Sequence, residues 1–220
     1  MSRRKLHHYQ FSAQAKNVIE AGKPLYTSVK GKWNELYFNN DNQIILELAC
    51  GKGEYTVGLG KLFPHKNFIG MDIKGDRIAR GSLMATENKL ENVAFLRAGI
   101  QYSDEFFEEN ELDEIWLVHP DPQVRERDEN KRLTNLTFLS QYAKYLKSDG
   151  SFFLKTDSSF LYDYSLKSLV DSKLYEVIEH TDNLYDSELL GDHHGVKTHY
   201  ETIFVKKGYS IKYIKAKLLY

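Results

Sequence analysis

Two acidic residues flank a pair of glycines in the first half of the chain, at a spacing that suits ligand binding. Glu47 lies in a short apolar run, residues 44–48, and Gly51 and Gly53 follow it directly. Asp72 ends a second apolar run, about 20 residues after Gly51, which is the ribose-binding spacing of nucleotide-binding α/β folds. The glycines would allow a tight turn and a close approach of the backbone to a ligand.

The charges around this turn favour a cationic ligand over a pyrophosphate. A dinucleotide-binding turn has a third glycine where this chain has Thr56, and an acid so close would repel a phosphate. A carboxylate is better matched to the sulfonium and amino groups of S-adenosylmethionine. The pattern resembles motif I of the class I methyltransferases, which predicts cofactor contacts at Glu47, Gly51, Gly53 and Asp72. An ordinary strand-to-helix connection without a ligand is the alternative interpretation.

A second group of residues that could do chemistry follows a later apolar run. Pro120 and Pro122 flank Asp121 and would fix its carboxylate at the end of a strand. Basic residues follow, and beside a rigid carboxylate they are candidates for phosphate contacts: Arg125, Arg127, Lys131 and Arg132. Because acidic residues are interspersed among them, a solvated loop is the alternative.

The elements that must position these residues alternate along the chain. Strands are expected at 44–48, 67–73, 93–97, 114–119, 151–156, 175–179 and 202–206. Helices are expected near 54–63, 76–90, 102–109, 134–147 and 159–171. This alternation predicts an α/β fold, a doubly wound and mostly parallel sheet of seven strands. The final pair of strands, with no clear helix between them, would suit the class I methyltransferase sheet, whose last strand is antiparallel.

The predicted strand ends carry most of the candidate residues. In an open α/β sheet, ligands bind beyond the carboxyl ends of the strands. Those ends carry Glu47, Asp72, Asp121 and Asp157, with His119 just before the Pro-Asp-Pro loop. We therefore expect a site built from several strand ends along one edge.

Length and composition indicate one domain overall, with an N-terminal extension over residues 1–42 that we expect to pack on or near the site. The resemblance to motif I implies that residues 43–220 are a methyltransferase domain. Thirty basic and thirty-one acidic residues give a net charge of −1, so a nucleic-acid surface would have to be local. Positive charge gathers near both ends, for example at Arg3, Arg4, Lys5, Lys206 and Lys207. One cysteine and no apolar run of membrane-spanning length predict a cytoplasmic protein with no membrane association.

Four short motifs together resemble the tRNA (guanine-N7-)-methyltransferase family. They are Pro120-Asp121-Pro122, the basic stretch ending Lys131-Arg132-Leu133-Thr134, Lys155-Thr156-Asp157 and Thr198-His199-Tyr200-Glu201. The resemblance covers roughly residues 40 to 208. It implies methylation of guanosine 46 in the tRNA variable loop with S-adenosyl-L-methionine as cofactor. No obligatory protein partner is evident, and the expected state is a monomer or homodimer.

The resemblance also implies roles for individual residues. Glu47, Asp72 and Asp121 match cofactor contacts, and Asp121 also matches the catalytic position. Matches to substrate contacts are Arg125, Asp157, Thr198, Tyr200 and Glu201. Guanine N7 carries a free lone pair, so no nucleophile or metal is required and no metal site is expected. Without the resemblance, Asp157 could instead cap a helix. Residues 198–201 could likewise be a hydrophilic entry to an edge strand.

The chain departs from the family pattern at three places. Gln123 stands where the family usually has tryptophan, and Gly99-Ile100 stands where an Asp-Ala pair is frequent. The basic stretch is diluted by Asp128 and Asn130. Two alternatives stay open. The near-neutral charge supports a class I methyltransferase acting on a small molecule or protein, and the lost tryptophan and Gly99 support a catalytically silent RNA-binding homologue.

Overall fold

The computed structural model describes residues 11–219, and the chain divides into two compact units, Met1–Glu108 and Glu109–Tyr220. The first unit contains a parallel sheet in the order β1-β4-β3-β2. Its strands are β1 (Val18–Ile19), β2 (Ile44–Leu48), β3 (Asn67–Met71) and β4 (Val93–Leu96). Its helices are α2 (Glu54–Leu62) and α3 (Gly75–Glu87), with the short helices η1 (Pro24–Thr27), η2 (Trp33–Phe38) and η3 (Ile100–Glu105).

Every residue of β2, β3 and β4 is buried. Strands that are covered on both faces read as continuous apolar runs, which is why the sequence located these three. The helices predicted at 54–63 and 76–90 are confirmed as α2 and α3. The helix predicted near 102–109 is replaced by the shorter η3.

The described part of the predicted N-terminal extension, residues 11–42, is integrated into the first unit. Val18 and Ile19 form β1, which the sequence analysis did not predict, and pair with β4. Trp33 is fully buried, and its indole N–H donates to the Phe106 carbonyl at 2.9 Å. The packing of this segment on the site stays a prediction. The basic residues Arg3, Arg4 and Lys5 lie outside the described residues.

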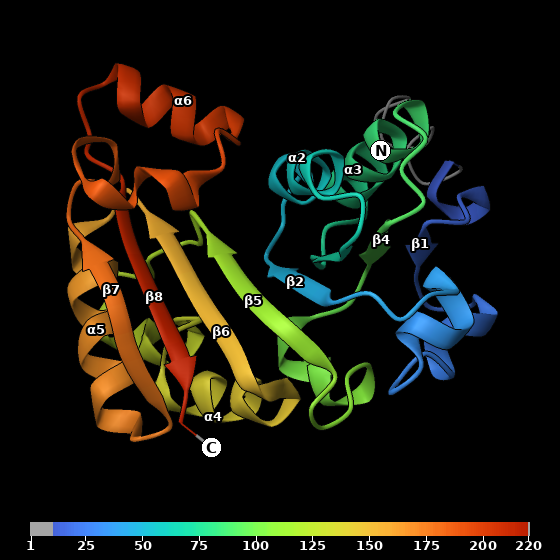
Figure 1. The fold of residues 1–220 in the computed structure, drawn as a ribbon, viewed down its shortest axis with the longest axis horizontal. Helices are drawn as coiled ribbons and strands as arrows, with labels where there is room; N and C mark the ends of the chain where they lie inside the picture. Colours follow the sequence, from blue (N-terminus) through green and yellow to red (C-terminus); the bar gives the residue numbers. More distant parts are fainter. Residues whose placement is uncertain (1–10, 220) are drawn as a thin grey trace. The chain divides into compact units, whose positions relative to one another are not determined.

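The second unit contains a mixed sheet in the order β5-β6-β8-β7 (Figure 1). Its strands are β5 (Leu112–Val118), β6 (Leu146–Thr156), β7 (Tyr175–Thr181) and β8 (Lys212–Leu218). β5 and β6 are parallel, whereas β8 runs antiparallel to both β6 and β7. The helices are α4 (Leu136–Tyr145), α5 (Ser159–Ser172), α6 (His199–Lys206), η4 (Glu126–Lys131), η5 (Leu184–Asp186) and η6 (Glu188–His193).

The strand predicted at 202–206 is wrong, because these residues belong to the helix α6. Thr198 is the N-cap of α6, and its side chain accepts a hydrogen bond from the Glu201 backbone N–H at 3.1 Å. The last strand is β8, and it is antiparallel as expected. With β1 and β8 included, the described residues form eight strands rather than seven. None of the helices formed by residues 11–219 is both long and apolar enough to span a bilayer.

The Phe95 ring on β4 packs against three glycines of the first unit, Gly53, Gly70 and Gly81. A Cβ atom on Gly81 in α3 would lie 2.6 Å from the Phe95 ring and 3.0 Å from the Lys52 carbonyl oxygen. A Cβ on Gly53 would lie 2.4 Å from the same ring. Because these positions have no side chain, α3 and the glycine turn can pack closely against β4.

We expect Gly81→Ala to destabilise the protein, although alanine is favoured over glycine in a helix by about 1 kcal/mol. The added methyl must displace the Phe95 ring or the Lys52 carbonyl, and overpacking of this kind costs about 1–3 kcal/mol. Urea denaturation measures the change. The matched control is Gly191→Ala, because nothing lies within 4 Å of a Cβ there. A gain in stability for Gly81→Ala would contradict the packing argument.

Candidate functional site

The glycine turn of the first unit connects β2 to α2 and has one open face. Gly51 and Gly53 have φ values of 57° and 69°, in the left-handed region that favours glycine. A Cβ on Gly51 would meet no atom within 4 Å, whereas Gly53 packs against Phe95. The two predicted glycine contacts therefore differ: Gly51 leaves room for a ligand, and Gly53 is required for internal packing.

Glu47 lies beneath this turn and is buried. Its Oε2 accepts a hydrogen bond from the Thr56 backbone N–H at 2.8 Å and another from the Thr56 hydroxyl. The carboxylate thus binds the first turn of α2, where the helix dipole favours negative charge. Burial, reinforced by the charges of Asp72 and Glu54, raises the pKa of Glu47 to about 8. Thr56, which replaces the third glycine of a dinucleotide motif, is therefore the partner that holds Glu47.

Asp72 follows β3 and is fixed by two backbone groups. Its Oδ2 accepts from the Gly51 N–H at 3.0 Å, and its Oδ1 accepts from the Lys74 N–H at 2.7 Å. Each carboxylate oxygen has a second lone pair, so Asp72 can still accept hydrogen bonds from ribose hydroxyls. The Asp72 carboxylate disfavours a phosphate and suits a cation, and Glu47 adds negative charge once a nearby cation lowers its raised pKa. The residues present therefore fit S-adenosylmethionine, with Asp72 and Gly51 able to hold it and Glu47 behind them.

The Pro-Asp-Pro loop of the second unit exposes its carboxylate. Asp121 is exposed, and its Oδ1 accepts from the Gln123 backbone N–H at 3.2 Å. Gln123 has a φ of 48°, a conformation that few residues other than glycine adopt. The local hydrogen bond and the flanking prolines restrict the position of the Asp121 side chain.

Arg132 is buried and stabilises this loop by hydrogen bonds to its backbone. It is 5% exposed, and its guanidinium donates to the Gln123 carbonyl at 3.1 Å and to the Arg125 carbonyl at 3.3 Å. The guanidinium also lies over the rings of Phe160 and Tyr164, at 4.8 and 4.5 Å from their centroids. The predicted phosphate contact at Arg132 therefore needs correction, because a buried guanidinium with these partners stabilises the loop instead.

The other predicted phosphate contacts differ from Arg132 in exposure. The side chains of Arg127 and Lys131 are 75% and 63% exposed, and Lys131 Nζ lies 2.6 Å from Asp128 Oδ1. Arg125, at the N-cap of η4, is exposed. Exposed pairs of this kind are weak and can exchange partners. These three cations can therefore reach a polyanion.

Asp157 follows β6 and is not a helix cap. Ser158 caps α5 instead, because its hydroxyl accepts from the Leu161 N–H at 3.2 Å. The Asp157 side chain is 26% exposed, and its Oδ1 lies 3.4 Å from His119 Nδ1. Burial by itself would raise the pKa of Asp157, but the His119 contact outweighs it, and the net shift is downward. Asp157 is therefore an ionised, partly accessible carboxylate.

The four residues 198–201 point in different directions from the start of α6. Thr198 caps the helix, whereas Tyr200 is 52% exposed and stacks on Phe204 with 6.3 Å between centroids. Glu201 is fully buried. Thr-x-x-Glu before an apolar run is a capping-box signal, so the sequence contained information for a helix here that the strand prediction missed.

Glu201 is the centre of a buried polar cluster that the sequence analysis did not find. Lys155 Nζ lies 3.1 Å from its Oε2, and His193 Nε2 and the Tyr185 hydroxyl each lie 2.8 Å from its Oε1. Lys155 is also fully buried. His119 and Lys155 together help to hold the pKa of Glu201 far below its usual value, against the effect of burial. A guanine that donates to Glu201 would have to share the carboxylate with these protein donors.

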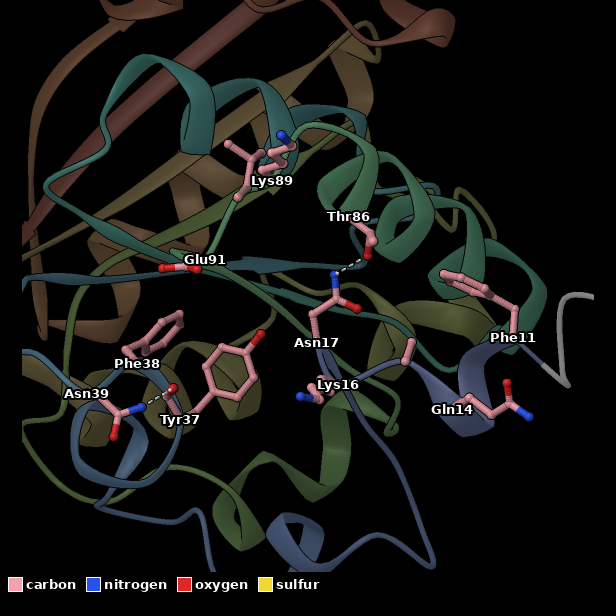
Figure 2. A pocket seen from close by; sticks show the side chains of 12 residues that line it. Phe11, Gln14, Lys16, Asn17, Tyr37, Phe38, Asn39, Thr86, Lys89 and Glu91 are labelled. Atoms are coloured by element: carbon pink, nitrogen blue, oxygen red, sulfur yellow. Dashed lines mark hydrogen bonds between the residues drawn. The ribbon is translucent and has the colours of Figure 1, made fainter.

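A pocket of about 880 Å³ lies elsewhere in the first unit (Figure 2). Its lining includes Asn17, Tyr37, Phe38 and Lys89. The Tyr37 hydroxyl donates to the carbonyl of Val93, the first residue of β4. The pocket is thus at the amino end of this strand, whereas ligands of open α/β sheets bind beyond carboxyl ends. None of the predicted site residues lines it.

Comparison with known proteins identifies the family. A family model described as "Putative methyltransferase" matches residues 41–214. A tRNA (guanine-N(7)-)-methyltransferase of Cytophaga hutchinsonii is 41% identical over 220 residues, covering 100% of this chain and 99% of the relative. One of the same name from Bacteroides fragilis is 48% identical over 187 residues, covering 85% and 73%.

Solved structures show the same fold at low identity. The 16S rRNA methyltransferase KamB superposes with a TM-score of 0.64 at 10% identity, covering 86% of this chain and 93% of that one. An antibiotic-related methyltransferase superposes with a TM-score of 0.61 at 16% identity, covering 93% and 97%. The predicted fold class, a class I methyltransferase sheet with mostly parallel strands, is confirmed. Together with the relatives, these findings show that the chain belongs to the tRNA (guanine-N(7)-)-methyltransferase family.

Proposed function

We propose that the protein transfers the methyl group of S-adenosylmethionine to N7 of guanosine 46 in the variable loop of tRNA. The methyl donor, the enzyme class and the tRNA substrate are those of the family to which the chain belongs. The observation that carries the proposal is the match to the Cytophaga hutchinsonii relative, which is 41% identical over the full length of the chain. The modified position and the roles of single residues are our inference.

The first unit is proposed to hold the methyl donor, which supplies an electrophilic methyl group on a sulfonium sulfur. Asp72 accepts hydrogen bonds from the ribose hydroxyls, and the open face of Gly51 leaves space for the ligand beside the turn. Glu47 fixes the start of α2 through Thr56. Because a nearby positive charge favours the ionised carboxylate, a bound cation would lower the pKa of Glu47 from its raised value.

The second unit is proposed to hold the guanosine. N7 needs no deprotonation, so the residues have to orient the base rather than remove a proton. By resemblance to the family, Asp121 is the proposed catalytic carboxylate and a contact to the cofactor. Its exposure, and a loop fixed by prolines and Arg132, support the catalytic role. Asp157 accepts from guanine N1–H and its amino group, with Arg125 as a further contact. Thr198 and Tyr200 form the α6 part of the proposed substrate site, where the exposed Tyr200 ring can stack on a base. Glu201, also predicted as a substrate contact, is fully buried and supports this part of α6 from within.

Asp121→Asn is expected to lower kcat/KM for tRNA by about 100-fold, the size of loss that misplacing a reactant causes. The substitution keeps the shape of the side chain but removes its charge. Transfer of labelled methyl groups to bulk tRNA measures the effect. The matched control is Asp149→Asn, because the Asp149 side chain is 89% exposed and forms an ion pair with the surface side chain of Lys217. Near-normal turnover by Asp121→Asn would exclude the proposed role.

The position of methylation can be tested directly with two tRNA transcripts. We expect the wild-type protein to methylate a transcript with guanosine at position 46 and not one with adenosine there. Chemical cleavage at 7-methylguanosine maps the product. Equal methylation of both transcripts would contradict position 46 while leaving the tRNA activity intact. Cofactor binding without methylation of any tRNA would favour the catalytically silent homologue. Methylation of other substrates only would favour a methyltransferase that acts on a small molecule or protein.

The salt dependence of tRNA binding should separate the exposed cations from Arg132. Each phosphate contact that is removed should reduce the slope of log affinity against log salt by about 0.7–0.9. We expect this reduction for Arg127→Gln and for Lys131→Gln, and neither substitution should change the free energy of unfolding. Arg132→Gln should instead lower the stability of the protein, because its guanidinium supports the Pro-Asp-Pro loop. A slope unchanged in the first two variants would argue against phosphate contacts from η4.

A further inference from the structure

We propose that His119 is a positioning residue for the reaction, which holds the Asp157 carboxylate and the start of α6 in place through its imidazolium side chain. The inference rests on the proposed role of Asp157 in binding guanosine. It concerns a residue that neither the sequence motifs nor the family comparison assigned to the site. His119 touches neither the methyl donor nor the base in this proposal and acts through the carboxylates that it holds.

The geometry places the His119 ring between two carboxylates from different elements. The side chain is 5% exposed, with Nδ1 3.4 Å from Asp157 Oδ1 and Nε2 3.5 Å from Glu201 Oε2. Nε2 is buried and has no hydrogen-bond partner among the described residues. The ring therefore joins the loop after β6 to the inner face of α6, and a short movement of either would complete the second hydrogen bond.

The backbone of His119 is fixed so that the ring points to this position. Its N–H donates to the Lys155 carbonyl at 2.8 Å, which continues the pairing of β5 with β6. Its φ is 50°, in the left-handed region that residues with a side chain seldom occupy. Backbone outliers of this kind persist only where the surroundings impose them, and they concentrate at functional sites.

The charges around the ring require a second cation. Lys155 balances Glu201, and His193 and Tyr185 bond the other oxygen of Glu201. On β8, Lys212 is near enough to act on Asp157 electrostatically. A neutral imidazole has one donor and one acceptor nitrogen, so one carboxylate would face a lone pair. The doubly protonated ring can donate to both carboxylates and compensate the partly buried charge of Asp157.

The protonation equilibrium agrees with this geometry. Burial by itself would lower the pKa of His119, but the Asp157 and Glu201 carboxylates outweigh it and raise the pKa above the ordinary value of 6.5. A raised pKa in the folded state means that the contribution of His119 to stability is complete below pH 6.5. That contribution is lost as the pH rises through the folded-state pKa. The neutral ring has no charge and only one N–H for two carboxylates, so alkaline pH should weaken its hold on Asp157 and on the start of α6.

The expected consequence is a pH-dependent KM for tRNA. Asp157 binds the base before and during methyl transfer, so a weaker hold on it should weaken tRNA binding more than it slows the chemical step. KM of the wild-type protein should rise by about tenfold as His119 loses its proton, which is the loss expected for one charged hydrogen bond. His119→Gln, which cannot become charged, should show the raised KM at all pH values, with kcat close to wild type.

His180→Gln is the matched control, because His180 is an exposed histidine on β7 that bonds the Tyr162 hydroxyl. Its KM should follow the wild-type pH profile. The double variant His119→Gln with Asp157→Asn should bind tRNA no worse than Asp157→Asn by itself, since the two residues act as a unit. A wild-type pH profile in His119→Gln, or additive effects in the double variant, would overturn the proposal.

A titration of ring nitrogens by nitrogen-15 NMR tests the same pair without tRNA and without a His119 variant. The His119 pKa should be above the ordinary value in the wild-type protein and should fall in Asp157→Asn. An ordinary pKa, or one that Asp157→Asn leaves unchanged, would contradict the proposal even if His119→Gln does not fold. Absence of methyl transfer by the wild-type protein would instead contradict the proposed function, so the two failures can be distinguished.

Discussion

Buried carboxylates have to be matched by donors, and this constraint determines the architecture around the candidate residues in both units. An unpaired charge away from water is so costly that each buried acid needs fixed partners. Glu47 bonds Thr56, Asp72 bonds two backbone N–H groups, and Glu201 bonds Lys155, His193 and Tyr185. These bonds join strand ends to the starts of helices. The same groups that would contact ligands therefore also determine where α2 and α6 begin.

The candidate residues divide into supporting and accessible groups by burial. Glu47, Arg132 and Glu201 are almost inaccessible and support neighbouring loops and helices. Asp121, Arg127 and Tyr200 are exposed and available to substrate. A site needs both kinds, because a reacting geometry is kept only when the contacting side chains are themselves held by a rigid surrounding. His119 belongs between the groups, since it is buried but acts on the partly exposed Asp157.

The departure at Gln123 can be explained from the loop geometry. Its backbone N–H donates to Asp121, and its carbonyl accepts from Arg132. Both interactions use the main chain, so the loop does not depend on the tryptophan that the family usually has at this position. The positive φ of Gln123 is maintained by these two bonds. The loop can therefore present Asp121 in the same way with a different side chain at this position.

The sequence by itself determined the features that rest on local signals. Continuous apolar runs located β2, β3 and β4, and the spacing of Gly51 and Gly53 located the turn beside Asp72, because these patterns follow from burial and backbone freedom within a short segment. The error at 202–206 arose where two local signals competed. The consecutive apolar residues Ile203, Phe204 and Val205 favoured a strand, whereas the Thr198 cap produced a helix.

Only the tertiary structure decided which charged residues are buried. Arg132 was expected on the surface, and it became a loop support because α5 brings Phe160 and Tyr164 beneath it. Glu201 meets Lys155, 46 positions away, and His119 meets Asp157, 38 positions away. The physical reason is that desolvation of a charge is tolerated only when partners surround it. Those partners come from other strands and helices, so no pattern within one segment contains them.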